Sequence, residues 1–323
     1  MKMKKIFFLA LFANLFLNYF FTVGQNKNTV QANNPIGLGI AEHRDFVLST
    51  GDLVVCGDDQ VFVLNGDAAK KGEVKYKWKW RASEAKEELP ASYQGLLATL
   101  DECKPVDHHT KLLITSSGGA TILLDIASKK VLFYAKTPMA HSADLLPNNR
   151  IGVANSTHVS GNSLEIYDIG KNEQVIYKDS LYSGHGIVWD DASKQLLALG
   201  FDELRIYELA NWSSSEPKLH LVKSYKLPDE GGHDLSKVDK EHFLVSTHHG
   251  VWVFDTEKEL FEPFVPLATH VNVKSANYDR NSDNLVFTIA EESWWTFNIY
   301  GENPKIKLHI PSVKLYKVRT VSN

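Results

Sequence analysis

The chain has 323 residues, of which 43% are hydrophobic and 23% are charged, and its formal net charge is −4. This length and composition are typical of a globular protein with a substantial buried core. The small excess of acidic residues argues against a general nucleic-acid binder, because such proteins present a basic surface. We therefore expect a globular protein without a nucleic-acid partner.

The first 25 residues have the organisation of a secretory signal peptide. Met1–Lys5 is basic, residues 6–21 form an apolar run that only Asn14 and Asn18 interrupt, and small or polar residues follow up to Gln25. This pattern predicts export, cleavage near Gln25 and a polar linker at 26–35. The alternative is an uncleaved membrane anchor, although the apolar run is short for a span. We expect a periplasmic or secreted protein that is free of the membrane after cleavage.

Short runs of alternating apolar residues fill most of the rest of the chain, residues 36–323. Val, Ile, Leu, Tyr, Phe and Trp are frequent in them, and turn residues recur about every 8–12 positions, as in all-β proteins. The only helix-like segment, 83–100, contains Pro90 and predicts a long loop with one or two helical turns. Six groups of strands repeat every ~45 residues, which favours a six-bladed β-propeller. A pair of β-sandwiches is the alternative, but it does not explain the fixed spacing.

The two ends of this segment complement each other. The first group of strands lacks an innermost strand, whereas the last predicted strand, 313–321, has no partner after it. Both features are explained if the C-terminal strand joins the first blade, because a closed ring leaves no exposed strand edges.

The two cysteines, Cys56 and Cys103, fall in predicted inner strands of neighbouring blades. In an exported protein they could form a disulfide, or they could remain as two buried thiols. The sequence leaves both alternatives open.

One basic or imidazole side chain aligns at the start of each predicted innermost strand. The six positions are Lys104, His141, His185, His233, Lys274 and, in the closing strand, Arg319 or Lys317. The innermost strands of a propeller line its central channel, so these side chains are expected to form an axial funnel that contains no carboxylate. Like charges at short range are costly unless an anion or a metal lies among them or some are neutral. The alternative is that each side chain is separately solvated and bonded to a nearby carbonyl.

His141, His185 and His233 come from three adjacent blades and are the candidate catalytic residues. Three imidazoles are also a candidate site for a divalent metal. Without a metal, one of them is a candidate general base, held neutral by its cationic neighbours. Asp144 and Asp234 are candidates for orienting these imidazoles, or for ordinary turn and capping roles.

The turns on the same face carry further polar and aromatic residues. Lys104, Lys274 and Arg319 are expected to bind an acidic group, together with His158, His248 and Trp294 from these turns. Aromatic rings stack on sugar faces, and cations bind carboxylate or sulfate, so the expected ligand is an acidic oligosaccharide or polysaccharide. Trp294 and its neighbour Trp295 also begin the predicted strand 294–300, so packing within the blade is the alternative role for them.

Several motifs resemble an uncharacterised family of exported six-bladed propeller proteins over essentially the whole mature chain. These motifs are residues 141–147, 184–190, 232–235 and 273–275. The resemblance implies the propeller fold and brings no established activity. A more distant likeness is to oligogalacturonate lyases, propellers that bind a divalent metal through histidines and use another His as the base; it rests on fold and His content, so no ligands are transferred.

The sequence thus predicts an exported, monomeric propeller whose axial funnel binds an acidic saccharide. A polysaccharide or oligosaccharide lyase is the enzymatic hypothesis, with cations that stabilise an enolate-like intermediate and a His as the base. The alternatives are carbohydrate binding without turnover and a protein-interaction scaffold.

Overall fold

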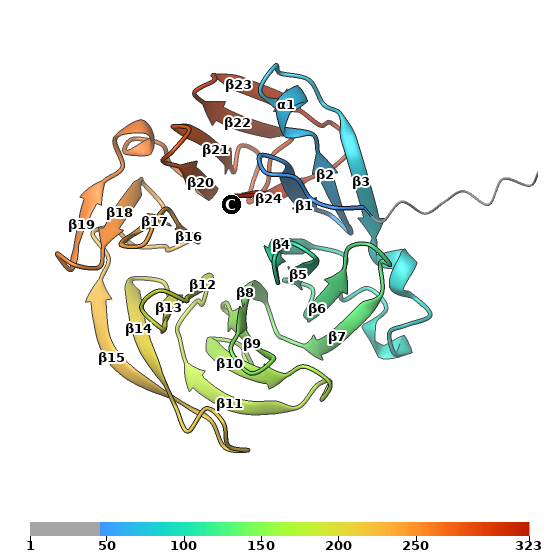
Figure 1. The fold of residues 1–323 in the computed structure, drawn as a ribbon, viewed down its shortest axis with the longest axis vertical. Coiled ribbons are helices and arrows are strands. Elements are labelled where there is room, and N and C mark those ends of the chain that lie inside the picture. The colour runs from blue at the N-terminus through green and yellow to red at the C-terminus, as the bar shows by residue number, and fades with distance from the viewer. Residues whose placement is uncertain (1–45, 323) are drawn as a thin grey trace, which may run out of the picture. The chain divides into compact units, whose positions relative to one another are not determined.

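The computed structural model describes residues 46–322. The predicted signal peptide (1–25) and linker (26–35) lie outside these residues. Within the described part, six four-stranded antiparallel sheets are arranged around a central axis (Figure 1). The predicted six-bladed β-propeller is therefore confirmed. No helix of the described residues is long and apolar enough to cross a membrane.

The blades, named A to F, follow the chain, and in each of them the first-named strand is the one nearest the axis. Blade A contains β24 (Leu315–Thr320), β1 (Leu53–Gly57), β2 (Gln60–Leu64) and β3 (Tyr76–Arg81). Blade B contains β4 (Leu100–Val106), β5 (Lys111–Ser116), β6 (Ala120–Asp125) and β7 (Val131–Lys136). Blade C contains β8 (Ala140–Leu146), β9 (Arg150–Asn155), β10 (Ser163–Asp168) and β11 (Val175–Ser180).

The second half of the ring repeats this pattern. Blade D contains β12 (Gly186–Asp190), β13 (Gln195–Leu199), β14 (Glu203–Ala210) and β15 (Lys218–Lys226). Blade E contains β16 (Asp234–Lys237), β17 (His242–Ser246), β18 (Val251–Asp255) and β19 (Leu260–Pro263). Blade F contains β20 (Val273–Asp279), β21 (Asn284–Ile289), β22 (Asn298–Glu302) and β23 (Ile306–His309). Short helices occur at α1 (Gly66–Ala69) and, as 3-10 turns, at Ala82–Ala85, Ala91–Tyr93 and Val265–Leu267.

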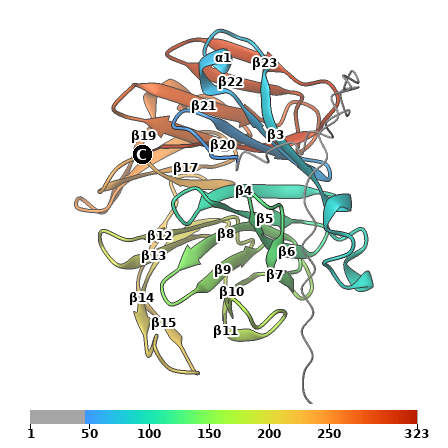
Figure 2. The ribbon, with the colours of Figure 1, turned by 45° about the vertical axis from the view of Figure 1, so that its right-hand side comes forward.

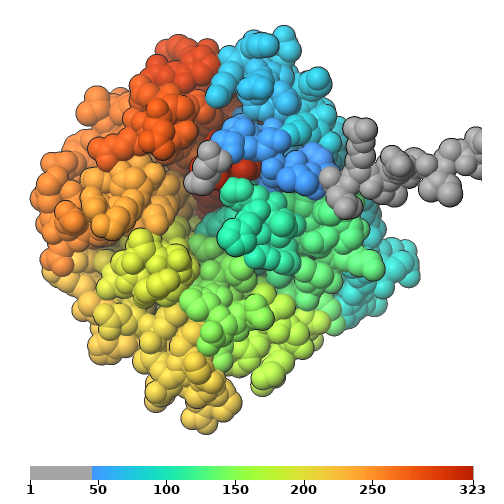
Figure 3. All heavy atoms as spheres, in the orientation of Figure 1, coloured from blue at the N-terminus to red at the C-terminus, as the bar shows by residue number. Residues whose placement is uncertain are grey.

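The hydrophobic core is divided among the gaps between neighbouring blades. In β1, for example, Val54 and Cys56 pack toward blade B, whereas Leu53 and Val55 pack toward blade F. Successive side chains of a strand point to opposite faces of a sheet, so each inner strand contributes to two gaps. One cluster of buried apolar residues fills each of the six gaps, and neighbouring blades pack against one another around the ring (Figure 3).

The C-terminal strand closes the ring as predicted. β24 pairs with β1 through Leu53 with Thr320, Val54 with Arg319, and Val55 with Val318. The first and last blades therefore lie side by side, as the turned view shows (Figure 2).

The structure bears on three local expectations. The loop from 82 to 99 contains two 3-10 turns, as expected. The expectation that Trp294 and Trp295 lie in a strand is wrong, because β22 begins only at Asn298. Cys56 and Cys103 are both fully buried, free thiols, which decides the alternative that the sequence left open.

Candidate functional site

A shift of register at the start of the inner strands places two consecutive side chains on the axis. In β4, Leu100 pairs with Ser116 but Glu102 pairs with Thr115, so Asp101 is an extra residue. β8 has the same shift between Ala140 and Ser142. The same shift occurs in β20 and β24, and such bulges re-aim side chains without ending the strand.

The side chains at the start of the six inner strands form a ring at one mouth of the channel, which we call the entrance tier. Its members, one from each blade from A to F, are Tyr316, Asp101, His141, His185, His233 and Lys274. All six are buried. His141, His185, His233 and Lys274 were predicted to share one level of the channel, and this is confirmed. Lys104 and Arg319 were predicted to lie at the same level, which is wrong, because each lies three residues further along its strand than the entrance-tier residue.

The imidazoles of the entrance tier contact one another. The ring centroids of His141 and His185 are 4.3 Å apart, and those of His185 and His233 are 5.6 Å apart. Tyr316 is 5.9 Å from His141 on the other side. Side chains from blades A, C, D and E thus converge at the axis.

Backbone carbonyls orient two of these imidazoles. His141 Nδ1 lies 2.9 Å from the carbonyl oxygen of Met139, and His185 Nδ1 lies 2.8 Å from that of Ser183. A carbonyl oxygen only accepts, so each Nδ1 carries the proton and each Nε2 presents a lone pair to the channel. Asp144 and Asp234 were expected to orient these rings, but they pair with lysine and arginine instead.

His233 and Lys274 form a pair of a different kind. Lys274 Nζ lies 2.8 Å from His233 Nε2, so the ammonium donates to the imidazole. His233 Nδ1 is buried and has no hydrogen-bond partner. Within residues 46–322, no carboxylate forms a salt bridge with Lys274. Lys274 is therefore a buried cation bonded to a neutral ring.

Burial keeps these imidazoles neutral. It is the largest cause of the lowered pKa of His141, where the Asp101 carboxylate partly opposes it. The pKa of His185 is well below its usual value, because burial and the other two rings act in the same direction. Burial, Lys274 and His248 lower the pKa of His233 to about 2. Burial and the nearby Lys317 also lower the pKa of Lys274, to about 8, so it is still mainly charged at neutral pH.

The pKa values of the acidic and phenolic members of the tier are raised instead of lowered. Burial raises the pKa of Asp101, although His141 opposes the shift, with its Nε2 3.8 Å from the carboxylate. Burial, with Asp101 and Asp234, raises the pKa of Tyr316. Tyr316 therefore keeps its proton at neutral pH and can donate it in a hydrogen bond.

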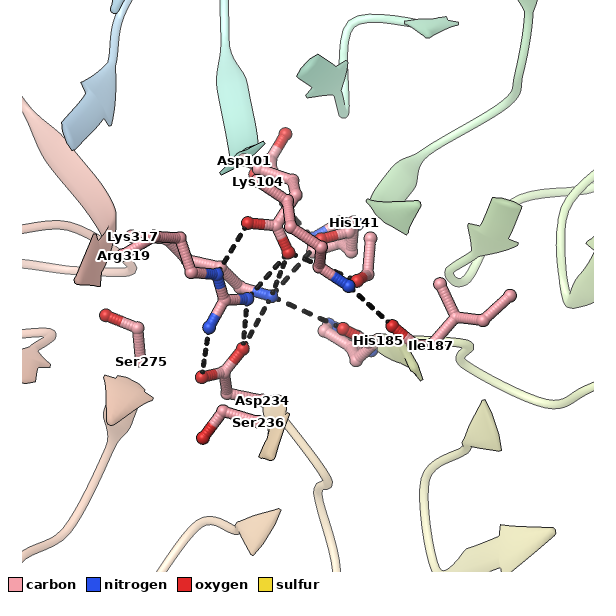
Figure 4. Close-up of polar contacts among 12 residues, drawn as sticks. Asp101, Lys104, His141, His185, Ile187, Asp234, Ser236, Ser275, Lys317 and Arg319 are labelled. Carbon is pink, nitrogen blue, oxygen red and sulfur yellow. Dashed lines mark hydrogen bonds and ion pairs between the residues drawn. The ribbon is translucent and has the colours of Figure 1, made fainter. Parts of the chain in front are cut away.

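Below the entrance tier, four buried charges close the channel, and we call them the axial plug. They are Glu102, Asp234, Lys317 and Arg319. Figure 4 labels the last three of them. Arg319 donates to both oxygens of Glu102 (2.8 and 2.6 Å) and to both oxygens of Asp234 (2.9 and 2.7 Å). Lys317 Nζ is 3.0 Å from Asp234 and donates to the carbonyl oxygens of His141 and His185.

The expectation of a channel without carboxylates is therefore wrong. Burial acts to raise the pKa of Glu102, but Arg319 and Lys317 outweigh it and lower the value to about 2. The pKa of Asp234 is lowered for the same reason. The charge of Lys104 is also balanced within the protein, because its Nζ lies 3.3 Å from the Asp144 carboxylate. The same Nζ lies 2.6 Å from the carbonyl oxygen of Ile187. The hydrogen-bonding groups of Lys104 and Arg319 are thus engaged within the protein.

The residues predicted from the turns lie at different distances from the entrance tier. His248 joins it, with its ring centroid 5.0 Å from that of His233. His158 is exposed and accepts a hydrogen bond from the Ser160 backbone within its own turn. Trp294 is 55% exposed in the connection between β21 and β22. The structure therefore brings His248 into the cluster and leaves His158 and Trp294 in the turns around it.

The comparisons with known proteins place the chain in a family. The model of a family of unknown function, DUF6528, matches residues 3–323. The chain belongs to this family. A search of curated proteins gave no match.

A solved structure shares the fold of this DUF6528 member. It is the crystal structure of a protein of unknown function from Bacteroides caccae, with a TM-score of 0.55 and 13% sequence identity. The match covers 84% of this chain and 98% of that one. At this identity the likeness supports the fold alone. Neither match bears on the likeness to oligogalacturonate lyases, which remains a hypothesis.

The described part of the DUF6528 chain presents no preformed metal cage. Within residues 46–322, no group of three or more His, Cys, Asp or Glu side chains is arranged so that it could hold a metal ion. His141 and His185 have the carbonyl-bound Nδ1 that is common among metal-ligating imidazoles. The ammonium of Lys274 against His233 Nε2, however, opposes a cation at the third imidazole.

Sequence reasoning missed Asp101, Tyr316 and Glu102. The repeat alignment matched basic residues in each blade, and in β4 and β24 it therefore chose Lys104 and Arg319, three residues beyond the true equivalents Asp101 and Tyr316. One available signal was that Asp101, like His141 and Lys274, directly follows the apolar residue that begins its strand.

Proposed function

We propose that this DUF6528 protein is an exported propeller that binds an acidic saccharide at the entrance tier, with the ligand's carboxylate against Lys274. The observation that carries the proposal is the charge state of Lys274. The other cations of the channel, Lys104, Lys317 and Arg319, are each within ion-pair distance of a carboxylate. Among the described residues, the hydrogen-bond partner of the Lys274 ammonium is the neutral His233 ring.

A buried charge without a counter-ion is unfavourable, so the site gains free energy by accepting an anion. Because the imidazoles are neutral, they add hydrogen-bonding groups without adding charge. The axial plug adds no net charge to the site, because its two carboxylates balance its two cations. A carboxylate at Lys274 would give this cation the counter-ion that no salt bridge within residues 46–322 supplies.

Lyase chemistry is the catalytic form of this proposal. The Nε2 lone pair of His141 or His185 would accept the proton from the carbon next to the carboxylate, and Lys274 would stabilise the enolate-like intermediate. The bond from the adjacent carbon to the leaving oxygen would then break. Tyr316, which keeps its proton, would donate it to that oxygen. The non-catalytic form is carbohydrate binding by the same groups, and a scaffold function is the third form.

A divalent metal at His141, His185 and His233 is the second candidate, and it would require these side chains to move from the positions that they have in the structure. The carbonyl-bound Nδ1 atoms of His141 and His185 favour it, because they fix the tautomer that leaves Nε2 free for a ligand bond. A metal there would attract the same carboxylate, after displacement of the Lys274 ammonium from His233.

The test is calorimetric titration of the mature protein with galacturonate, glucuronate and short oligosaccharides from pectate, alginate and hyaluronan. We expect at least one of these acids to bind, and Lys274→Met to weaken its binding by at least tenfold. The matched control is Lys104→Met, which removes a lysine that already has a carboxylate and should leave the affinity unchanged. Equal losses in both variants, or no binding by the wild type, would refute the proposal.

Turnover is tested separately by the ultraviolet absorbance of the unsaturated uronate that an elimination produces. Loss of this signal in His185→Ala or His141→Ala, with binding retained, would support a lyase. Binding without any product in the wild type would support the non-catalytic form.

A further inference from the structure

Three aromatic side chains form a row from the exposed surface to the entrance tier. Tyr182 is 57% exposed, and its ring centroid is 5.6 Å from that of Phe201. Phe201 is 6.0 Å from His248, which in turn is 5.0 Å from His233. We call Tyr182, Phe201 and His248 the aromatic row.

The row is assembled from three connections that belong to different blades. Tyr182 lies between β11 and β12, Phe201 lies between β13 and β14, and His248 lies between β17 and β18. These connections lie on the face where the innermost strands begin. The row therefore runs from the connection between blades C and D, across blade D, to the turn between β17 and β18 in blade E.

Backbone contacts tie this row to the segment that carries His233. The Phe201 backbone N–H donates to the Tyr182 carbonyl at 2.9 Å, and the Gly232 N–H donates to the Phe201 carbonyl at 2.9 Å. Gly231 makes room for His248, because a Cβ at position 231 would lie 2.3 Å from two atoms of the imidazole. The row is thus a fixed extension of the entrance tier.

Exposed aromatic surface beside a polar site is typical of a ligand-binding surface. Aromatic rings offer a flat apolar face, which suits the C–H face of a sugar ring. Tyr182 and Phe201 are separated from His233 by the His248 ring, so a single sugar acid bound at Lys274 would leave them uncovered. A longer ligand can cover both.

We propose that the ligand is an oligosaccharide or polysaccharide, with one acidic sugar at Lys274 and a neighbouring sugar ring stacked on Phe201 and Tyr182. This rests on the proposed function, because the acidic sugar occupies the site described there. The charge of Lys274 determines where the carboxylate binds, and the aromatic row determines the direction in which the saccharide chain leaves the axis.

The experiment compares a monosaccharide with a trisaccharide of the same acid, for example galacturonate with trigalacturonate, by calorimetry. It uses the mature protein and the variants Tyr182→Ala, Phe201→Ala and Tyr182→Leu, with thermal unfolding as a check on folding. Stacking of one aromatic ring contributes about a three- to tenfold change in affinity. The control is Tyr76→Ala, which removes a partly exposed tyrosine from the outer strand β3, away from this face.

We expect the wild type to bind the trisaccharide more tightly than the monosaccharide. Tyr182→Ala, Tyr182→Leu and Phe201→Ala should each weaken only the trisaccharide, and Tyr76→Ala should weaken neither. Equal affinity of the wild type for both ligands, or equal losses for both ligands in the variants, would overturn the inference while the carboxylate site stands. Binding of a protein partner that these variants abolish, with saccharide affinity unchanged, would also overturn it. No binding of either saccharide would refute the proposed function itself.

Discussion

Arg319 in the last strand forms a bidentate ion pair with Asp234 of blade E, with N–O distances of 2.9 and 2.7 Å. It forms a second one with Glu102 of blade B. Blade E does not adjoin blade A, so the side chain crosses the channel. The strand that closes the ring is thus held both by its backbone pairing with β1 and by a buried ionic connection to two other blades.

Arg319→Met should lower the free energy of unfolding by about 3–5 kcal/mol, because it leaves Glu102 and Asp234 buried with only Lys317 to balance them. Arg319→Lys should restore little of this, since an ammonium cannot form two bidentate pairs. Urea unfolding measures both variants.

The control for this prediction is Arg280→Met, which breaks an exposed ion pair with Asp239. Its cost should be below about 1 kcal/mol. A similar cost for Arg319→Met would mean that the axial plug adds no more than a surface pair.

Acid should begin to destabilise the protein well above the range in which carboxylates titrate. His141, His185 and His233 have lowered pKa values, so the unfolded chain binds more protons than the folded one below about pH 6.5. Their contribution to stability is complete above that pH and is lost as the pH falls, with a limiting slope of about 1.4 kcal/mol per pH unit for a ring that stays neutral in the folded protein. The pKa of Asp101 is raised, so above about pH 3.8 this group binds more protons in the folded chain than in the unfolded one. Its contribution to the pH dependence of stability therefore opposes that of the imidazoles.

Urea unfolding at about pH 7, 6 and 5 measures this slope. His185→Gln should reduce it by about one imidazole's share. A flat profile over this range would show that the folded and unfolded chains bind the same number of protons, so that the pKa values of the imidazoles are not lowered.

Gly231→Ala should destabilise the protein by more than the cost of its backbone conformation alone. Gly231 has φ +74°, and a Cβ there would collide with the His248 ring. Gly72 has a similar φ of +78° with open space around it, so Gly72→Ala measures the conformational cost separately. We expect Gly231→Ala to cost at least about 1 kcal/mol more than Gly72→Ala.

A second substitution tests the cause. His248→Ala in the Gly231→Ala background should recover most of this excess, because it removes the colliding ring. Equal costs for the two glycine variants would show that the ring moves aside freely.

If a divalent metal binds at the three imidazoles, Lys274 should oppose it. Lys274→Gln removes the ammonium that lies 2.8 Å from His233 Nε2, so zinc affinity should rise, whereas His185→Ala should lower it. Zinc titration followed by calorimetry, with metal analysis of the purified protein, checks both directions. Affinity that is unchanged in both variants would exclude this site as the place of metal binding.

Much of the fold was predictable because alternation and repetition are local properties of the chain. The period-2 runs predicted the strands, their recurrence predicted six blades, and the unpartnered last strand predicted closure through β24 and β1. The histidines that meet at the axis were also found, because each follows a similar small or polar segment in its blade.

The composition of the candidate site was less predictable. Asp101, and not Lys104, lies beside His141, because β4 and β8 carry the same extra residue at this level, and a period-2 pattern does not reveal such a bulge.

The amino-acid sequence by itself determined the strands, the number of blades and the side chains available at the axis. Only the tertiary structure decided how their charges are balanced. Glu102 and Asp234 are far from Arg319 in the sequence and belong to different blades, so their pairing exists only where the six inner strands converge. That convergence neutralises Lys104, Lys317 and Arg319, and it leaves Lys274 against a neutral imidazole as the position that favours an anion.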